Sequence, residues 1–279
     1  MINSTKILTP ILLIIFVCNN LHAQDWNRHG KVTHEIGVSI GVPFFSTDYG
    51  ERYETQSSGA GNTGFGISAI HYFTLADYRY RWNQRHSFFR DHFRFRTELS
   101  YYQAKLEHFG QYVDDSQTSD QADRLRAHTG EAKTINFGTQ AEYHFVNITD
   151  FGSRRNPKLR FSPYLSIGIM ATYYNPSIET TYGDGDWESN YDLLYQKWAN
   201  PAYVSTDAGF TGTLTSSLGS RIKLGEYSDV FLEGKWHYYF NDWIDGLNAT
   251  GPDVNGTDPN NKYNDWSLFV NFGFIYYLN

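Results

Sequence analysis

The C-terminal segment from Trp266 to Leu278 alternates strictly between apolar and mixed residues. One parity is apolar without a break: Trp266, Leu268, Val270, Phe272, Phe274, Tyr276 and Leu278. The residues at the alternate positions have smaller and partly polar side chains, with Ser267, Asn271 and Gly273 among them. In a β-strand the two parities face opposite sides of the sheet. A long strand that is apolar on one side and more polar on the other, at the end of a chain, is typical of a bacterial outer-membrane β-barrel.

Seven further segments show the same alternation. Their apolar parities run from Ile36 to Val42, Phe65 to Phe73, Phe93 to Tyr101, Ile135 to Phe145, Phe161 to Tyr173, Leu214 to Leu224 and Val230 to Phe240. The fold class predicted from these eight segments is all-β, an eight-stranded antiparallel transmembrane up-and-down barrel. An even number of strands puts both termini on one side of the membrane, and we expect that side to be the periplasm.

The N-terminal segment supplies the export signal that such a barrel needs. Lys6 precedes an apolar run from Ile7 to Val17, and a small residue, Ala23, follows shortly after it. This pattern predicts a secretory signal peptide over residues 1–23 and a single barrel domain over residues 24–279. The apolar run is too short for a transmembrane helix.

Composition excludes several classes of function. The single cysteine, Cys18, falls within the predicted signal peptide, so we expect a mature chain with neither disulfides nor thiol chemistry. A formal net charge of −7 argues against a nucleic-acid partner. The mean hydropathy of −0.53 is compatible with a barrel, because alternating strands average out in any window. We expect no cofactor and no metal ligand set.

The charged residues of the predicted strands all have the parity opposite to the apolar face, as they should, because a charge facing lipid near the midplane costs about 2–4 kcal/mol. Five are positive and four are negative: Glu35, Arg94, Arg96, Glu98, Glu142, Arg221, Lys223, Glu233 and Lys235. This near balance predicts a lumen plugged by ion pairs, with Arg94 and Arg96 facing Glu142 and with Arg221 approaching Glu233. Eight strands enclose only enough space for side chains, so a narrow ion channel is the lesser alternative.

Aromatic residues at the strand ends predict two membrane-interface belts. The outer belt is assigned Phe44, Phe45, Tyr102, Tyr173, Tyr174, Tyr239, Trp243 and Trp266. The inner belt is assigned Tyr72, Phe73, Phe93, Tyr143, Phe145, Phe161, Tyr276 and Tyr277. A sugar-binding platform is the alternative to anchoring.

Four long polar connections, at 43–62, 104–131, 174–210 and 242–264, are expected to face outward. The stretch from Asp114 to Arg126 can form a short surface helix. Two acidic, turn-rich stretches, Tyr182 to Trp187 and Gly251 to Asn261, are interpreted as solvated turns. Calcium binding is the alternative for both, although neither has the EF-hand spacing.

The inward connection at 74–90 is unusually long and carries a basic, aromatic group of residues: Arg79, Arg81, Trp82, Arg85 and Arg90. The simplest interpretation is a solvated turn. The alternative is a docking surface for a periplasmic partner.

A lipid A-modifying enzyme is the main competing class for a small barrel. His144 and His237 have the inward parity near Glu142 and Glu233, and several serines share that parity. No nucleophile elbow of the type G-x-S-x-G is present, and a histidine on a polar barrel face is usually structural. We therefore expect no catalytic residue.

Several motifs resemble a family of small outer-membrane barrels of Bacteroidota, especially flavobacteria. They include Thr33 to Val38, Ser46 to Arg52, Gly64 to Ile67, Trp243 to Asn248 and Ile275 to Leu278, and further matches run the length of the mature chain. More distantly, this family is similar to the PorG-like barrel of type IX secretion, which tethers periplasmic ring proteins to the outer membrane.

The resemblance implies fold and location but no catalytic residue, because the close family has no defined function. The expected partners are outer-membrane lipid, lipopolysaccharide and the barrel-assembly machinery, with periplasmic secretion-system proteins if the distant similarity holds. A non-enzymatic scaffold or interaction protein, an accessory of a type IX-like machine, is the function expected. Fold alone does not fix function.

Overall fold

The computed structural model describes residues 32–50, 61–75, 87–152, 159–249 and 263–278. The predicted signal peptide, Arg79, Arg81, Trp82, Arg85 and the stretch from Gly251 to Asn261 lie outside these residues. Among the residues that the structure describes, no helix is long and apolar enough to cross a bilayer.

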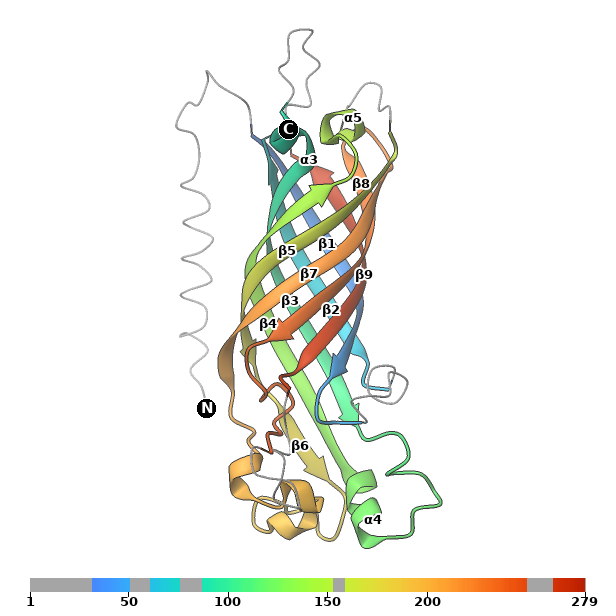
Figure 1. Cartoon of the computed structure of the whole chain (residues 1–279), viewed down its shortest axis with the longest axis vertical. Helices are drawn as coiled ribbons and strands as arrows, with labels where there is room; N and C mark the ends of the chain where they lie inside the picture. Colours follow the sequence, from blue (N-terminus) through green and yellow to red (C-terminus); the bar gives the residue numbers. More distant parts are fainter. Residues whose placement is uncertain (1–31, 51–60, 76–86, 153–158, 250–262, 279) are drawn as a thin grey trace. The chain divides into compact units, whose positions relative to one another are not determined.

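Eight long antiparallel strands form the molecule's main body (Figure 1). In chain order they are β1 (Thr33–Ser46), β2 (Gly64–Thr74), β3 (Phe93–Glu107), β4 (His128–His144), β5 (Phe161–Tyr174), β7 (Gly209–Lys223), β8 (Ser228–Tyr239) and β9 (Trp266–Tyr277). Every strand pairs with both of its neighbours, and β9 pairs with β1 to close the sheet. Closure leaves no unpaired edge, which a sheet spanning a membrane requires. The predicted fold class is confirmed.

The remaining elements lie at the two ends of the barrel. We call the end where β1 begins and β9 finishes the terminus end, and the opposite end the loop end. The terminus end carries the short helices α3 (Phe88–His92) and α5 (Ile148–Gly152), and the loop end carries α4 (Asp120–Ala127), β6 (Ser177–Thr180) and the 3-10 helices η1 (Tyr191–Leu193), η2 (Gln196–Trp198) and η3 (Pro201–Tyr203). The predicted surface helix is therefore present in its second half, where Ser119 accepts a hydrogen bond from the Ala122 amide as N-cap.

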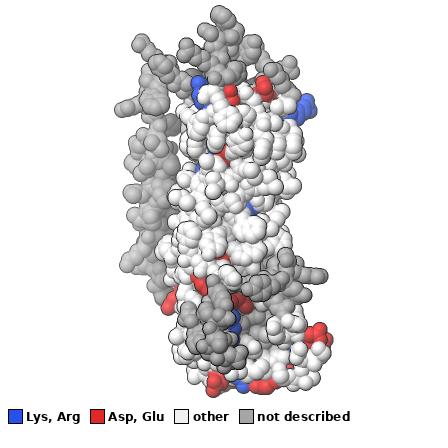
Figure 2. Space-filling model, in the orientation of Figure 1, with Lys and Arg blue, Asp and Glu red and all other residues white. Residues whose placement is uncertain are grey.

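The outer surface of the barrel is apolar on all eight strands. Ile167, Ile169 and Phe272, for example, expose more than half of their surface. No residue assigned above to an apolar strand face is buried in the barrel. Charged side chains gather at the two ends and are nearly missing from the flank in view (Figure 2). A closed barrel with an apolar flank and polar ends has the architecture of outer-membrane barrels.

Glycine in β7 makes room for an aromatic ring inside the barrel. A Cβ atom on Gly219 would lie 2.5 Å from the ring and hydroxyl of Tyr164, whose hydroxyl donates to Glu233 Oε2 at 2.8 Å. Gly234, on the neighbouring strand, has its nearest neighbour at 4.0 Å. Position 219 is therefore restricted by packing, and position 234 is not.

We expect Gly219→Ala to lower the free energy of unfolding by about 1–3 kcal/mol, because Tyr164 must move and release Glu233. Gly234→Ala is the matched control, and it should leave the unfolding midpoint nearly unchanged. Urea titration in lipid vesicles measures both. Equal midpoints for the two variants would contradict the close packing at Gly219.

Candidate functional site

The centre of the lumen is organised around Arg96 of β3. Its Nη1 atom donates to Glu142 Oε1 at 3.0 Å and to Glu233 Oε2 at 2.6 Å, and its Nη2 atom donates to Gln140 Oε1 at 2.5 Å. Lys235 of β8 donates to Glu98 of β3, and its Nζ atom lies 3.2 Å from Glu233 Oε1. These contacts join β3, β4 and β8 across the interior.

A second layer of ion pairs lies nearer the terminus end. Glu35 Oε2 accepts from Arg94 Nη1 at 3.2 Å and from Arg221 Nη2 at 2.6 Å. Asp229 Oδ2 accepts from Arg221 at 2.9 Å, and its Oδ1 atom lies 3.4 Å from Lys223 Nζ. The layer therefore connects β1, β3, β7 and β8.

All nine lumen charges named from the sequence lie inside the barrel and are buried. The structure adds Asp229, which also has the inward parity and brings the set to five positive and five negative charges. Balanced, mutually bonded charges avoid the large cost of an unpaired buried ion.

The expected contact between Arg221 and Glu233 is wrong. In the β7–β8 register Arg221 lies opposite Phe231, so Asp229 and Glu233 are equally near diagonal neighbours. Glu233 accepts a hydrogen bond from Arg96, and Arg221 donates to Asp229 and Glu35 instead. Similarly, Arg94 lies opposite Glu142 in register but donates to Glu35, while Arg96 holds Glu142.

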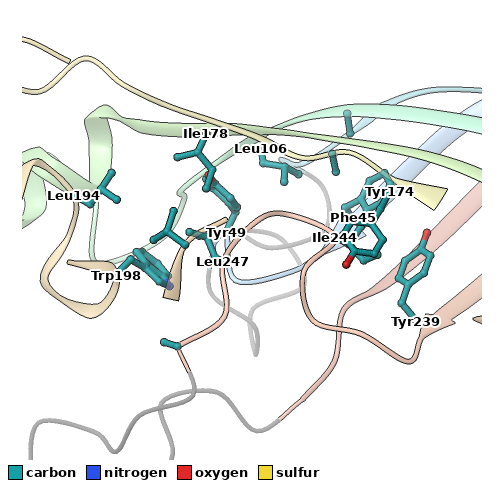
Figure 3. Packing of buried hydrophobic residues seen from close by; sticks show 14 of the residues in the cluster. Phe45, Tyr49, Leu106, Tyr174, Ile178, Leu194, Trp198, Tyr239, Ile244 and Leu247 are labelled. Atoms are coloured by element: carbon teal, nitrogen blue, oxygen red, sulfur yellow. The ribbon is translucent and has the colours of Figure 1, made fainter. Parts of the chain in front are cut away.

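The loop end of the lumen is closed by a hydrophobic core that the sequence did not reveal (Figure 3). We call this core, together with the loop segments that form it, the cap. Its residues come from all four loop-end connections and from the inward positions of the last strand turns: Phe45, Tyr49, Tyr102, Leu106, Leu125, Tyr174, Ile178, Trp187, Leu194, Trp198, Val204, Tyr239, Ile244, Leu247 and Phe269. The connections are thus packed together and not simply solvated.

Four aromatic residues assigned to the outer belt belong to the cap. Phe45, Tyr102, Tyr174 and Tyr239 are buried inside the barrel mouth and do not face lipid. At the terminus end Tyr72 and Tyr277 are likewise buried in the interior. Their parity is opposite to that of the apolar outer face of their strands, which is the sequence signal that identifies them as interior residues.

The predicted solvated turn from Tyr182 to Trp187 is exposed or partly exposed at every residue except the last. Trp187 is buried, and its indole nitrogen donates to the Ile178 carbonyl at 3.2 Å. Gly183 and Gly185 have positive φ values of 67° and 78°, which allow the tight turn that brings Trp187 back to β6. Among the described residues, no group of three His, Cys, Asp or Glu side chains could hold a metal ion.

A buried carboxylate fixes the conformation of the cap. Asp245 Oδ2 accepts from the Asp48 amide at 2.9 Å, and Asp245 Oδ1 accepts from the Leu247 amide at 2.9 Å. Lys197 Nζ lies 3.6 Å from Asp48 Oδ1. Burial and the neighbouring Asp48 carboxylate raise the pKa of Asp245 to about 7. These contacts join the β1–β2, β6–β7 and β8–β9 connections.

Only Arg90 of the basic inward group lies among the described residues, on α3. Its Nε atom donates to the Leu75 carbonyl at 3.1 Å. Phe88 and Phe89 of the same helix are exposed beside Phe93, and the rings of Phe89 and Phe93 stack at 4.9 Å. The described part of this connection therefore carries one basic side chain beside exposed aromatic rings.

A hydroxyl–imidazole–carboxylate chain lies inside the barrel near the terminus end. His144 Nδ1 lies 2.8 Å from Ser162 Oγ, and His144 Nε2 lies 3.2 Å from Glu142 Oε2. The three residue types match those of a hydrolytic triad. All three side chains are fully buried, however, and the hydroxyl faces the plugged lumen. The arrangement is that of a structural polar network.

Neither a protein-family model nor a curated protein matches the sequence. Among solved structures, the chain is similar to Neisserial surface protein A, with 12% identity, a TM-score of 0.37 and coverage of 88% of this chain and 98% of that one. It is similar to Ail, the attachment invasion locus protein of Yersinia pestis, solved with the heparin analogue sucrose octasulfate, with 8% identity, a TM-score of 0.37 and coverage of 89% and 99%. The outer membrane enzyme PagL matches with 10% identity, a TM-score of 0.34 and coverage of 86% and 97%. Likeness at this level carries no statement about what the chain binds or catalyses.

Proposed function

We propose that this protein is a non-enzymatic outer-membrane scaffold that has a sealed lumen and presents its folded cap for interaction. One observation carries this proposal: the same barrel interior is filled by a balanced set of ten buried charges and is then closed by a hydrophobic core drawn from four connections. A conducting pore needs a continuous wet path, and an enzyme needs a reachable nucleophile.

Planar-bilayer recording of the purified protein tests the sealed lumen. We expect no steady, ion-selective openings, because an ion would have to displace both the cap and the paired charges. Steady openings with a reproducible conductance would support the narrow-channel alternative. A refolded porin in the same bilayer serves as the positive control.

We further propose that the scaffold is an accessory of a secretion machine of the type IX kind, with the terminus end in the periplasm. The motifs that resemble flavobacterial barrels support this assignment, as does the basic connection that contains Arg79, Arg81, Trp82, Arg85 and Arg90. The partners would be periplasmic secretion proteins, with lipopolysaccharide and the assembly machinery serving the barrel itself.

Co-purification from the native host tests this assignment. We expect ring or translocon components to accompany the natural protein and to be lost when the four arginines are replaced by glutamine. Replacement of Lys105 and Lys133, which lie at the loop end, is the control for a general loss of positive charge. Recovery of no periplasmic protein with the natural chain would contradict the assignment.

A second candidate, ester hydrolysis such as lipid A modification, has one observation in its favour, the Ser162–His144–Glu142 chain. A fluorophosphonate probe distinguishes the two functions. We expect no labelling of the folded protein, because Ser162 is buried. Labelling that disappears in Ser162→Ala would establish the enzyme.

A further inference from the structure

Two histidines occupy the place where the loop-end connections meet. His108, from the β3–β4 connection, is stacked between Tyr49 at 4.7 Å and Trp198 at 5.3 Å, measured between ring centroids. His128, at the start of β4, packs against the same two rings and against His108, at 5.2–5.6 Å. Tyr49 follows β1 and Trp198 belongs to the β6–β7 connection, so the imidazoles bridge three connections.

The hydrogen bond to His108 requires a neutral ring. The Gly50 amide donates to His108 Nδ1 at 3.3 Å, so Nδ1 must present a lone pair and the proton must reside on Nε2. A second proton would place an N–H group directly against the Gly50 N–H group. His108 Nε2 and His128 Nδ1 are buried and have no hydrogen-bond partner within the described residues. In the closed cap an added proton on His108 therefore meets the Gly50 N–H group and finds no acceptor.

The charged group that acts on His108 disfavours its protonation. Lys197, whose Nζ atom lies 5.0 Å from the Trp198 ring centroid, disfavours a cation. Burial, together with His128 and Lys197, holds the pKa of His108 well below its ordinary value. Asp48 and Asp245, from the β1–β2 and β8–β9 connections, act on Tyr49: burial and these two carboxyl groups raise the pKa of its phenol well above the ordinary value. The phenol is therefore neutral, and its hydroxyl lies 3.3 Å from His128 Nε2.

We propose that the cap is an acid-released latch, in which the neutral imidazoles of His108 and His128 hold the loop-end connections together and their protonation separates these connections while the barrel stays closed. The latch goes beyond the scaffold function, since it would change the surface that the loop end presents without opening the sheet. The ladder that closes the barrel, between β1 and β9, contains neither histidine.

The sign of the pH effect follows from proton counting. The opened cap releases two histidines with ordinary pKa values of about 6.5, so acid favours opening by roughly three orders of magnitude between pH 7.5 and 5.0. Asp245 opposes this, because its pKa of about 7 in the closed cap returns to an ordinary value on opening. Protonation of Asp245 stabilises the closed cap as the pH falls. This effect cancels roughly two of the three orders of magnitude by which the histidines favour opening. The net expectation is about a tenfold rise in opening.

Hydrogen–deuterium exchange of the full protein in vesicles measures this opening. Two amides that join separate connections are the reporters: Asn248 donates to the Tyr203 carbonyl and Ser205 donates to the Gly246 carbonyl, both at 2.9 Å. Relative to intrinsic exchange rates, their exchange should rise about tenfold from pH 7.5 to 5.0. Amides in β9 should not change. A flat or falling response of the reporters would overturn the latch.

Three variants make the test specific. Asp245→Asn keeps one of the two acceptor oxygens and removes the opposing carboxyl, so the acid response should steepen to roughly a hundredfold or more, whatever the opening at pH 7.5. The double variant His108→Gln with His128→Gln should show no acid-induced rise. His92→Gln, at the terminus end, is the matched control and should respond like the natural protein.

An unchanged tenfold rise in the double histidine variant would contradict the proposal. If that variant is already open at pH 7.5, Asp245→Asn decides the question, because its cap retains both histidines. A steeper acid response then supports the latch, and an unchanged or weaker response overturns it.

Discussion

Replacement of Arg96 by alanine is expected to lower the free energy of unfolding by about 3–5 kcal/mol. The guanidinium is fully buried and donates to both Glu142 and Glu233. Its removal leaves carboxylates in the interior without their main counter-ion, which costs far more than the lost attraction between exposed groups. Urea titration in vesicles, followed by heat-modifiable migration on a gel, measures the change.

Two further variants show whether uncompensated charge is the cause. Lys133→Ala removes a partly exposed ion pair with Glu131 at the loop end of the barrel and should leave the midpoint nearly unchanged. Arg96→Met combined with Glu142→Gln removes one charge of each sign, and Glu233 keeps Lys235 as its partner. This double variant should be more stable than Arg96→Ala. An equally large loss would mean that packing volume, and not charge balance, dominates at this position.

Replacement of Trp198 by alanine is expected to cost about 3–5 kcal/mol of cap stability. The indole is 3% exposed and packs against both latch histidines. Because the barrel is held by a separate ladder of strand pairs, the loss should appear as local opening and not as unfolding of the sheet.

Limited trypsin digestion distinguishes these two results. Cleavage at Lys197 and Arg126 should become fast in Trp198→Ala, while the gel migration typical of a folded barrel persists. Tyr112→Ala is the matched control, since that aromatic side chain is 59% exposed on the same end of the molecule. Loss of the folded barrel in Trp198→Ala would show that cap and barrel unfold together.

The fold could be predicted because one physical rule governs every strand. A strand in a membrane must be apolar at every second residue, and the interior alone can hold charge. The same rule correctly identifies both parities in segments as different as Ile36 to Val42 and Trp266 to Leu278. It also applies to Phe45, Tyr102, Tyr174 and Tyr239, whose parity places them inside the barrel. Their assignment to the belt was wrong because their position near the strand ends resembles that of belt residues.

The loop residues of the cap could not be predicted because they follow no period. Tyr49, Trp198, Ile244 and Leu247 are isolated apolar residues in polar, turn-rich stretches, and each one alone resembles a chance surface residue. Only the tertiary structure brings them together over the barrel mouth. The hydrogen-bond partners of Arg221 could not be predicted for a related reason, because they depend on which carboxylates accept hydrogen bonds from Arg96.

Thiol accessibility at Thr215 tests most directly whether the lumen is sealed. Thr215 faces the interior between the cap and the Arg96 layer, is fully buried, and its hydroxyl has no hydrogen-bond partner among the described residues. In a Cys18→Ser background, Thr215→Cys carries the only thiol, and Asp207→Cys provides an exposed reference at the loop end. A small, charged methanethiosulfonate should modify Asp207→Cys rapidly and leave Thr215→Cys unmodified until the protein is unfolded in urea. Modification of folded Thr215→Cys at a rate close to that of Asp207→Cys would mean that the lumen is open to water.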